Sequence, residues 1–343
     1  NYLQMANAPF DVFTGDWVRA LCSGGALVIC PREVVLSPVE LADLISRRSI
    51  HFGEFIPSIL RNLVGHLQAH SKKLETMRWV VIGSEEWCDY EFASLGMAFA
   101  DTTRLVNSYG LSEATVDSTW YKYDGCSRHP GMTIGRPLSN TEVYVLDDDL
   151  NVVPIGARGE LYIGGAGLAR GYLGRPGQTA ERFVPHPFST APGARLYRTG
   201  DLARFRADGN LEFLGRRDHQ VKVRGYRIEL GEIEAALTGH PDVAAAVVVV
   251  REDTPSDKRL AAYVVPSARG VNVTALREHL QGLLPSYMVP HTVTTIAALP
   301  LTSNGKLDRR ALPIPVVDRS QSKAEYAPPR NAVEQVLAEI WAE

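Results

Sequence analysis

The amino-acid sequence predicts an α/β chain that passes into antiparallel β structure and then into a small α+β region. Strand-like and helix-like segments alternate in the first third of the chain. A pattern typical of hairpins runs from about residue 135 to residue 215, and a compact mixture of helices and strands follows residue 218. At 343 residues, the chain is long enough for two domains or slightly more.

The first third is expected to form a largely parallel sheet covered by helices. Short apolar runs typical of buried strands occur at 27–29, 50–52 and 79–82. Residues Ser37 to Glu40 have the spacing of a capping box, with Pro38 at the first helical position, so a helix is expected to begin there. Loops at strand ends are where such folds bind ligands, which singles out 83–85 and 107–110.

The rest of the chain divides by pattern. Alternating residues at 141–146 and 159–163 predict hairpin strands. Further strands and helices are expected at 230 onward, 243–251, 260–265, 274–284 and 292–296. A Pro- and Ser-rich linker precedes an amphipathic helix at 332–343. The predicted domains are 1–134, 135–217, 218–314 and 315–343.

Composition argues against several classes of protein. Lys and Arg number 36 against 39 Asp and Glu, and this near balance argues against a nucleic-acid or polybasic membrane partner. No apolar run reaches the 18 residues of a membrane span. The four cysteines form no Cys-x-x-Cys pair, so neither a zinc ribbon nor a disulfide scaffold is expected. We therefore expect a cytoplasmic protein.

Four short segments are unusually dense in Gly, Arg and Asp: 197–202, 215–218, 225–229 and 304–309. Carboxylates accept hydrogen bonds from the vicinal hydroxyls of ribose, and the Arg fork fits phosphate oxygens. Asn304-Gly305 is a turn dipeptide that would expose Lys306, whose charge suits a nucleotidyl-transfer transition state. Each segment alone is as well explained by a turn or a surface ion pair.

In combination and in this order, these segments resemble the adenylation domains of nonribosomal peptide synthetases, in the acyl-adenylate-forming superfamily. The resemblance covers essentially the whole chain, with further matching motifs at 10–11, 107–113, 159–173, 215–234 and 284–290. It implies part of a large adenylate-forming domain with a small antiparallel barrel, followed by a small mobile C-terminal domain. Residues from 326 onward are similar to the entry into a carrier domain.

The resemblance implies that ATP and an amino acid form aminoacyl-AMP and pyrophosphate. The acyl group then passes to a phosphopantetheine thiol on a downstream carrier domain, and an upstream condensation domain is a further implied partner. The implied cofactors are ATP/AMP and Mg²⁺. The family's Ser/Thr/Gly-rich phosphate loop should precede Phe10 and is absent, so the chain is expected to be N-terminally truncated. An acyl- or aryl-CoA ligase, or a catalytically incomplete docking fragment, are the alternatives.

Residue roles follow by position from the resemblance. Lys306 matches the lysine that bridges the substrate carboxylate and AMP, and Glu113 matches the catalytic magnesium ligand. Asp218 matches the hinge, and Lys222 and Gly225 lie on the loop that faces the active site during thiolation. The implied nucleotide-binding residues, in which Tyr109 stacks on adenine and Asp201 accepts from the ribose, are Gly83, Ser84, Glu85, Asn107, Tyr109, Gly110, Asp201 and Arg216.

The side-chain pocket is carried over in the same way. Its lining would be Asp11, Val12, Gly15, Glu54, Val80, Ile82, Ser108, Val116, Asp117 and Lys306, with Asp11 on the substrate α-ammonium. Two carboxylates, Glu54 and Asp117, are costly in an otherwise apolar pocket unless a cation pairs with them. This favours a basic substrate: ornithine first, then lysine, arginine or diaminobutyrate. The open alternative is that one acid points away or binds a structural Arg.

Overall fold

The chain divides into two compact units, Asn1–Glu229 and Leu230–Glu343. The computed structural model describes residues 1–87, 91–123, 125, 131–218, 220–223, 225–253, 258–267, 270–300, 307–315 and 328–342. The finer domain boundaries that the sequence suggests at 134, 217 and 314 stay predictions.

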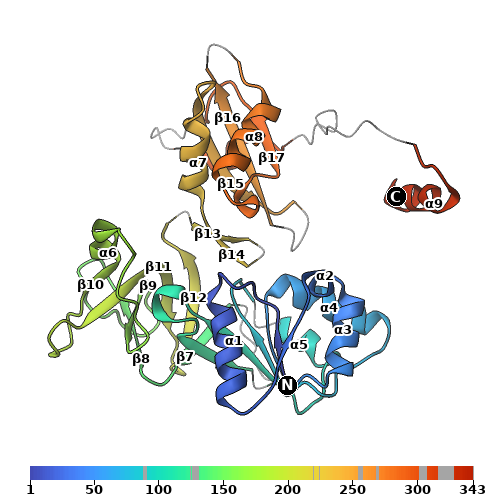
Figure 1. Ribbon diagram of the computed structural model, residues 1–343. Helices are drawn as coiled ribbons and strands as arrows, with labels where there is room; N and C mark the ends of the chain where they lie inside the picture. Colours follow the sequence, from blue (N-terminus) through green and yellow to red (C-terminus); the bar gives the residue numbers. More distant parts are fainter. Residues whose placement is uncertain are drawn as a thin grey trace. The chain divides into compact units, whose positions relative to one another are not determined.

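A parallel sheet begins the first unit (Figure 1). Its strands, in spatial order, are β2 (Leu27–Ile29), β1 (Tyr2–Gln4), β3 (Phe52–Phe55), β4 (Trp79–Ile82) and β5 (Arg104–Tyr109). The strands predicted at 27–29 and 79–82 are confirmed. The one predicted at 50–52 lies further along, at 52–55, and includes the acidic residue Glu54. A run of apolar residues does not extend to an acidic residue, so the predicted strand ended before Glu54. The structure can bury Glu54 in the strand because an arginine, Arg19, pairs with it.

Helices cover one face of these strands. They are α2 (Arg32–Leu36), α3 (Pro38–Arg47), α4 (Pro57–Ala69) and α5 (Phe92–Leu95), and α1 (Asp11–Cys22) lies apart from them (Figure 1). The predicted capping box is confirmed in part, since the Ser37 hydroxyl accepts from the Glu40 N–H at 3.4 Å. Leu41, Leu60 and Leu95 are fully buried against the strands. The α/β prediction for this region is therefore confirmed.

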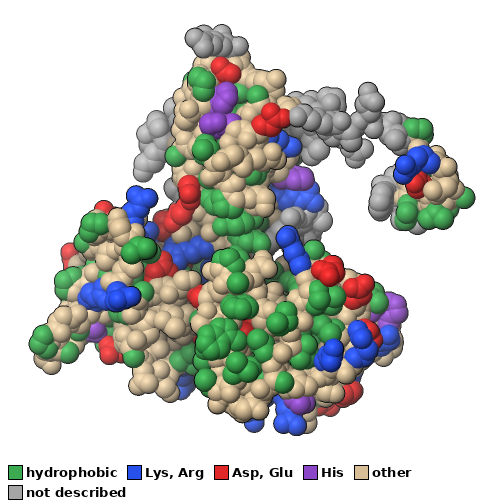
Figure 2. All heavy atoms as spheres, viewed as in Figure 1, with side chains coloured by type: hydrophobic (Ala, Val, Ile, Leu, Met, Phe, Trp, Pro, Cys, Tyr) green, Lys and Arg blue, Asp and Glu red, His purple; other side chains and the backbone are tan. Residues whose placement is uncertain are grey.

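The two faces of the sheet bury different residues. Phe55, Val80 and Ile82 join the large core beneath α3, α4 and α5. Phe52 and Val81 belong to a smaller core on the opposite face. Helix α1 leaves Trp17, Val18 and Leu21 exposed, and Figure 2 shows hydrophobic side chains gathered over this part of the molecule. This alternation decides below which side chains share a face with Glu54.

Antiparallel strands extend the same sheet. From β5 the order continues through β6 (Thr119–Lys122), β7 (Met132–Pro137), β12 (Leu211–Arg216), β11 (Arg195–Phe205), β9 (Gly159–Gly165) and β8 (Thr141–Leu146), and β10 (Phe183–Pro185) pairs with β11. A 3₁₀ turn at Ser112–Ala114 and the helix α6 (Pro176–Arg182) complete this part. The barrel-like region that the sequence predicts is thus continuous with the parallel sheet. A hairpin of β13 (Gln220–Val223) and β14 (Tyr226–Glu229) ends the unit.

The second unit has the α+β pattern that the sequence predicts. Its elements are α7 (Leu230–Thr238), β15 (Val243–Arg251), β16 (Arg259–Pro266), α8 (Val273–Leu283), β17 (Thr292–Thr295) and α9 (Ala332–Ala342), with 3₁₀ turns at Ser286–Met288 and Arg309–Ala311. β15 and β16 are antiparallel, and β17 is parallel to β16. The fully buried Tyr263 donates its hydroxyl proton to the Pro313 carbonyl at 2.6 Å, which ties the 307–313 segment to the sheet. Across the described residues, the helices are all too short or too polar to cross a membrane.

Gly135 in β7 lies directly against the backbone of Trp120 in the neighbouring antiparallel strand β6. Its φ is +80°, and a Cβ built there would lie 1.8 Å from the Trp120 carbonyl oxygen. Gly156 has a similar φ of +85°, but a Cβ there would meet nothing within 4 Å. Substitution at Gly156 would therefore add only backbone strain, whereas substitution at Gly135 would add both backbone strain and a steric clash.

We predict that Gly135→Ala destabilises the first unit far more than Gly156→Ala. The control carries only the left-handed strain, about 1–2 kcal/mol, whereas Gly135→Ala adds a clash and should cost about 3 kcal/mol or more. Urea unfolding of the two variants and the wild type measures the difference. Equal losses in the two variants would contradict the close approach of β6 and β7.

Candidate active site

The start of α1 holds the residue predicted to bind the substrate α-ammonium. Asp11 Oδ1 accepts from the Val12 N–H at 2.8 Å, and Oδ2 accepts from the Ser112 hydroxyl at 2.6 Å. Ser112 opens the 3₁₀ turn that also carries Glu113. Asp11, predicted to bind the substrate amino acid, and Glu113, predicted to bind the metal, therefore lie on adjoining elements at the carboxyl end of β5.

Three acidic side chains meet beneath α1, and we call Asp16, Glu54 and Asp117 the acid cluster. Arg19 lies among them, with its Nη1 2.7 Å from Glu54 Oε2 and 3.8 Å from Asp16 Oδ1, and its Nη2 on Asp117 Oδ2. The side chains of Glu54 and Asp117 are 5% and 8% exposed, against 25% for Arg19. The acids predicted to share a pocket do lie together.

Arg19 corrects the argument that only a substrate cation can pair with Glu54 and Asp117, because this arginine already bridges them. The alternative left open from the sequence, a structural Arg, is what the structure shows. A signal for it existed: Asp11, Gly15 and Arg19 are spaced four apart, so they fall on one face of a helix. A Cβ at Gly15 would lie 3.2 Å from Arg19 Nη1.

One guanidinium does not compensate the acid cluster fully. Burial raises the pKa of Glu54 to about 8, with Asp117 adding to the rise and Arg19 opposing it. Burial likewise raises the pKa of Asp16 to about 7 and raises the pKa of Asp117. Asp16 Oδ1 is buried and has no hydrogen-bond partner within the described part of the chain. Negative charge thus remains in excess there when all three groups ionise.

The walls of the predicted pocket need a correction of register. Glu54 is paired with Val81 in the parallel sheet, and Val80 and Ile82 face the opposite way, into the core beneath the helices. Two positions were therefore misplaced by one residue. Val81 shares the face of Glu54, and Gly83 follows on that face, since a Cβ there would lie 3.5 Å from Glu54 Oε1 and 2.7 Å from Ser108 Oγ. Ser108 is thus beside Glu54, as predicted.

The turn that supplies Val116 and Asp117 has an unusual backbone. Thr115 and Val116 have φ of +61° and +65°, although β-branched residues rarely adopt this region. The Thr115 hydroxyl donates to the Gly167 carbonyl at 2.6 Å, and a Cβ at Gly110 would come within 1.8 Å of the Val116 carbonyl oxygen. The loop therefore requires glycine at 110 and is pressed against the end of β5, where Asp117 reaches the acid cluster.

Asp201 on β11 connects the predicted nucleotide residues. Its Oδ2 accepts from the Tyr109 hydroxyl, and its Oδ1 accepts from Arg216 Nη1 at 2.5 Å. Burial and the neighbouring carboxylate raise the pKa of Tyr109. Arg216 in turn donates from Nε and Nη2 to Asp218 at 2.7 and 2.8 Å, and these bonds hold the pKa of Asp218 low against the opposing effect of burial.

Asn107 offers an unused acceptor in the same region. Its Nδ2 donates to the Thr133 carbonyl at 2.8 Å, while its buried Oδ1 has no hydrogen-bond partner among the described residues. An unpaired buried oxygen suits an amino group of a ligand. Ser84 has a φ of +69°, so the loop after β4 is strained as well.

The β13–β14 hairpin covers this group of residues. Lys222 lies with its Nζ 5.8 Å from the centre of the Tyr109 ring, and the Gly225 N–H donates to Glu85 Oε1 at 2.6 Å. Burial lowers the pKa of Lys222. Position along the sequence associates Lys222 and Gly225 with the site, but the partners Tyr109 and Glu85 are visible only in the fold.

Both carboxylate oxygens of Glu113 already accept hydrogen bonds. Its Oε1 accepts from the hydroxyls of Tyr172 and Tyr197 at 2.7 and 2.8 Å, and its Oε2 accepts from Arg227 Nη1 at 2.9 Å. Despite burial, Arg227 and the two hydroxyls hold the pKa of Glu113 low. A lone carboxylate suits Mg²⁺ that is shared with phosphate oxygens, but here Arg227 takes its open side. The described residues include no group of three acidic, His or Cys side chains that could hold a metal.

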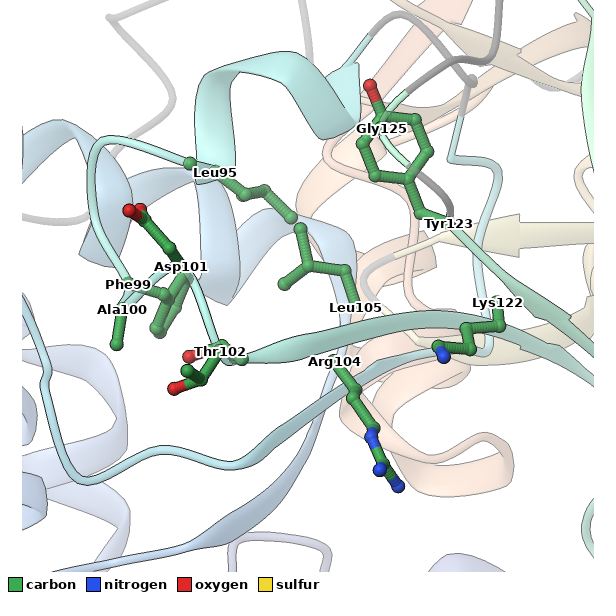
Figure 3. Close-up of a pocket in the computed structure, with 12 residues that line it drawn as sticks. Leu95, Phe99, Ala100, Asp101, Thr102, Arg104, Leu105, Lys122, Tyr123 and Gly125 are labelled. Atoms are coloured by element: carbon green, nitrogen blue, oxygen red, sulfur yellow. The ribbon is translucent and has the colours of Figure 1, made fainter.

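Two further features concern the extent of the site. Lys306 lies outside the described residues. A hollow of about 610 Å³ lies at the other end of β5, between the 95–105 segment and Lys122, where Leu95 and Leu105 point toward one another (Figure 3). None of the predicted site residues lines this hollow.

We predict that Glu54 makes stability pH-dependent. Because its folded-state pKa is raised, it contributes stability that is complete below pH 4.5 and is lost as pH rises toward 8. In urea unfolding from pH 5 to 8, Glu54→Gln should flatten the decline in unfolding free energy by up to about 1.4 kcal/mol per pH unit. The exposed Glu75→Gln is the control, and a slope unchanged by Glu54→Gln would contradict the burial of an uncompensated acid.

Comparison with known proteins agrees with this geometry. A family model described as AMP-binding enzyme matches residues 1–173, and one described as AMP-binding enzyme C-terminal domain matches residues 232–306. Tyrocidine synthase 3 of Brevibacillus parabrevis is 47% identical over 99% of this chain, and Bacitracin synthase 2 of Bacillus licheniformis is 45% identical over 100% of it. The chain spans only 5% and 13% of those two proteins.

A solved structure shares the fold. Holo-PA1221, an NRPS protein containing adenylation and PCP domains bound to a vinylsulfonamide inhibitor, is 30% identical with a TM-score of 0.78. The match covers 90% of this chain and 52% of that one. The chain therefore belongs to the AMP-binding enzyme family, as an adenylation domain of the nonribosomal peptide synthetase type.

Proposed function

We propose that this chain activates an amino acid as aminoacyl-AMP, with release of pyrophosphate, and passes the acyl group to a phosphopantetheine thiol on a downstream carrier domain. The observation that carries the proposal is the hydrogen bond between Asp11 and Ser112, which joins the predicted amino-acid residue to the turn that bears Glu113. Asp11, which would accept the substrate ammonium, thus lies next to Glu113, whose carboxylate would act near the phosphates. The condensation of an amino acid with ATP requires both groups in one site. An acyl- or aryl-CoA ligase would have no use for Asp11 at that place.

The residues divide the work of positioning. Asp11 would accept the α-ammonium and so direct the substrate carboxylate toward the α-phosphorus. Asp201, held by Arg216, would accept from the ribose hydroxyls after Tyr109 turns its hydroxyl away. A carboxylate oxygen then forms a bond to the α-phosphorus while the bond to pyrophosphate breaks. Lys306 is proposed to stabilise the negative charge that gathers in this step.

Magnesium remains part of the proposal, with Glu113 as its ligand. When bound, it would neutralise charge on the phosphate oxygens. The residues fit the metal only if Arg227 leaves Glu113 Oε2, so the hairpin arrangement described above is not the one that binds it. We assign that arrangement to thiol transfer, with Lys222 and Gly225 facing the site and Asp218 as the hinge.

We propose a basic side chain for the substrate, with ornithine as the first candidate and lysine, arginine and diaminobutyrate behind it. The charge balance of the acid cluster supports this, because three carboxyl groups share the single guanidinium of Arg19. A second cation would favour their ionised forms, which burial disfavours. A cytoplasmic setting and an upstream condensation domain as a further partner complete the proposal.

Amino-acid-dependent ATP–pyrophosphate exchange by the module that contains this chain tests the function. We predict exchange with ornithine at a kcat/KM at least tenfold above that with norvaline, a neutral side chain of similar length. Exchange with aryl or fatty acids but with no amino acid would contradict amino-acid activation. Exchange confined to neutral amino acids would contradict the basic side chain and leave adenylation standing.

We predict that Lys306→Ala lowers the rate of this exchange by about 10²- to 10³-fold, the size of effect seen when one transition-state donor is removed. Transfer from preformed aminoacyl-AMP to the carrier thiol should change little, because the lysine is assigned to adenylation alone. Arg310→Ala, which removes an exposed basic residue four positions away, is the control. Wild-type exchange by Lys306→Ala would remove the lysine from the mechanism.

A further inference from the structure

We propose that Arg19 is a specificity-determining residue that fills part of the side-chain pocket with its own guanidinium and thereby restricts the enzyme to short side chains ending in a primary ammonium. The inference rests on the proposed function and narrows its substrate class from basic amino acids in general to ornithine and diaminobutyrate. It follows from how Arg19 lies between the two acids, from what it leaves open, and from the charge that remains.

Arg19 takes the place that a substrate guanidinium would need. Its two terminal nitrogens bind one carboxylate each, Nη1 on Glu54 and Nη2 on Asp117, so the fork spans the pair. A planar guanidinium gains most from such two-point contact, and a second guanidinium cannot lie between the same two carboxylates while Arg19 is there. Arginine as substrate would therefore meet an acid pair that is already engaged.

One acceptor next to the fork stays open. Glu54 Oε2 binds Arg19, whereas Glu54 Oε1 accepts no hydrogen bond from the described residues and lies toward Gly83. Gly83 presents no side chain to Oε1, whereas a Cβ there would lie 3.5 Å from Oε1 and 2.7 Å from Ser108 Oγ. An ammonium needs only a point contact and can use a single oxygen.

The charge balance calls for a second cation in addition to Arg19. Asp16 is 2% exposed, and its Oδ1 lacks a hydrogen-bond partner in the described part of the chain. With Arg19 in place, the acid cluster still carries more acidic groups than cations. A substrate ammonium at Glu54 Oε1 would add the missing charge without displacing the fork.

The length limit comes from α1. Asp11, which holds the α-ammonium in the proposed function, and Arg19 stand two helical turns apart on the same face, with Gly15 between them. The Arg19 guanidinium lies over Gly15, since a Cβ at Gly15 would be 3.2 Å from Arg19 Nη1, so it closes this face one helical turn from Asp11. The side chain must therefore end before the guanidinium, which favours the shorter chains.

Exchange kinetics of Arg19→Ala test this inference in the module. The experiment compares kcat/KM for diaminobutyrate, ornithine, lysine and arginine between the wild type and the variant. We expect the wild type to prefer ornithine over arginine by at least about tenfold. In Arg19→Ala, the arginine-to-ornithine ratio should rise by at least about tenfold, since the substrate guanidinium can take the vacated place between Glu54 and Asp117.

Arg61→Ala is the matched control. Arg61 also pairs with a carboxylate, at 2.8 Å from Glu91, and stacks over an aromatic ring, at 5.1 Å from the centre of Trp87. Arg19 is comparable, with its guanidinium 5.8 Å from the centre of the Phe52 ring and a similar exposure. Arg61→Ala should leave the substrate ratio unchanged, so a general loss of stability is separated from a change in specificity.

Arg19→Lys covers the case in which Arg19→Ala does not fold. It keeps the charge but not the fork, so the ratio should shift the same way by a smaller factor. Equal kcat/KM for arginine and ornithine in the wild type would overturn the inference. So would an arginine-to-ornithine ratio that changes no more in Arg19→Ala than in Arg61→Ala. Either result would leave the proposal of a basic substrate intact. A wild type that activates only neutral or acidic amino acids would overturn both.

Discussion

Buried carboxylates need a cation, and this constraint orders the site. Arg19 holds Glu54 and Asp117, Arg216 holds Asp201, and Arg227 holds Glu113. The arginines come from α1, β12 and β14, and each contacts an acid on a different element. Because an acid left unpaired in such surroundings costs several kcal/mol, each arginine helps to fix the strand or turn that bears its partner. The acids that would grip substrate and nucleotide are therefore set in place before either ligand arrives.

Local pattern predicted the elements well but not the register of the sheet. The strand at 79–82 was expected, yet Val80 and Ile82 were assigned to the pocket when they face the helix core. Side chains alternate along a strand, so an error of one residue moves a side chain to the other face. Only the pairing of Glu54 with Val81 fixes which face is which, and that pairing is a long-range fact.

The partners of the acids were likewise beyond the reach of the sequence. Glu54 and Asp117 are recognisable as buried acids from their apolar surroundings. Arg19 is not, because α1 exposes apolar residues, so the apolar pattern of this helix does not indicate which face is buried. The hairpin contacts of Lys222 with Tyr109, and of Arg227 with Glu113, join residues more than a hundred positions apart. In the proposed function, Arg227 and Mg²⁺ would neutralise Glu113 in different half-reactions, because both need its Oε2 atom.

In the proposed complex, a substrate ammonium joins the acid cluster while Arg19 stays in place. A crystal structure of the module with a non-hydrolysable ornithinyl-adenylate analogue tests it most directly. We expect the side-chain ammonium within hydrogen-bond distance of Glu54 Oε1, beside Gly83, with Arg19 still bridging Glu54 and Asp117. A side chain directed away from Glu54, or an Arg19 displaced into solvent, would contradict it.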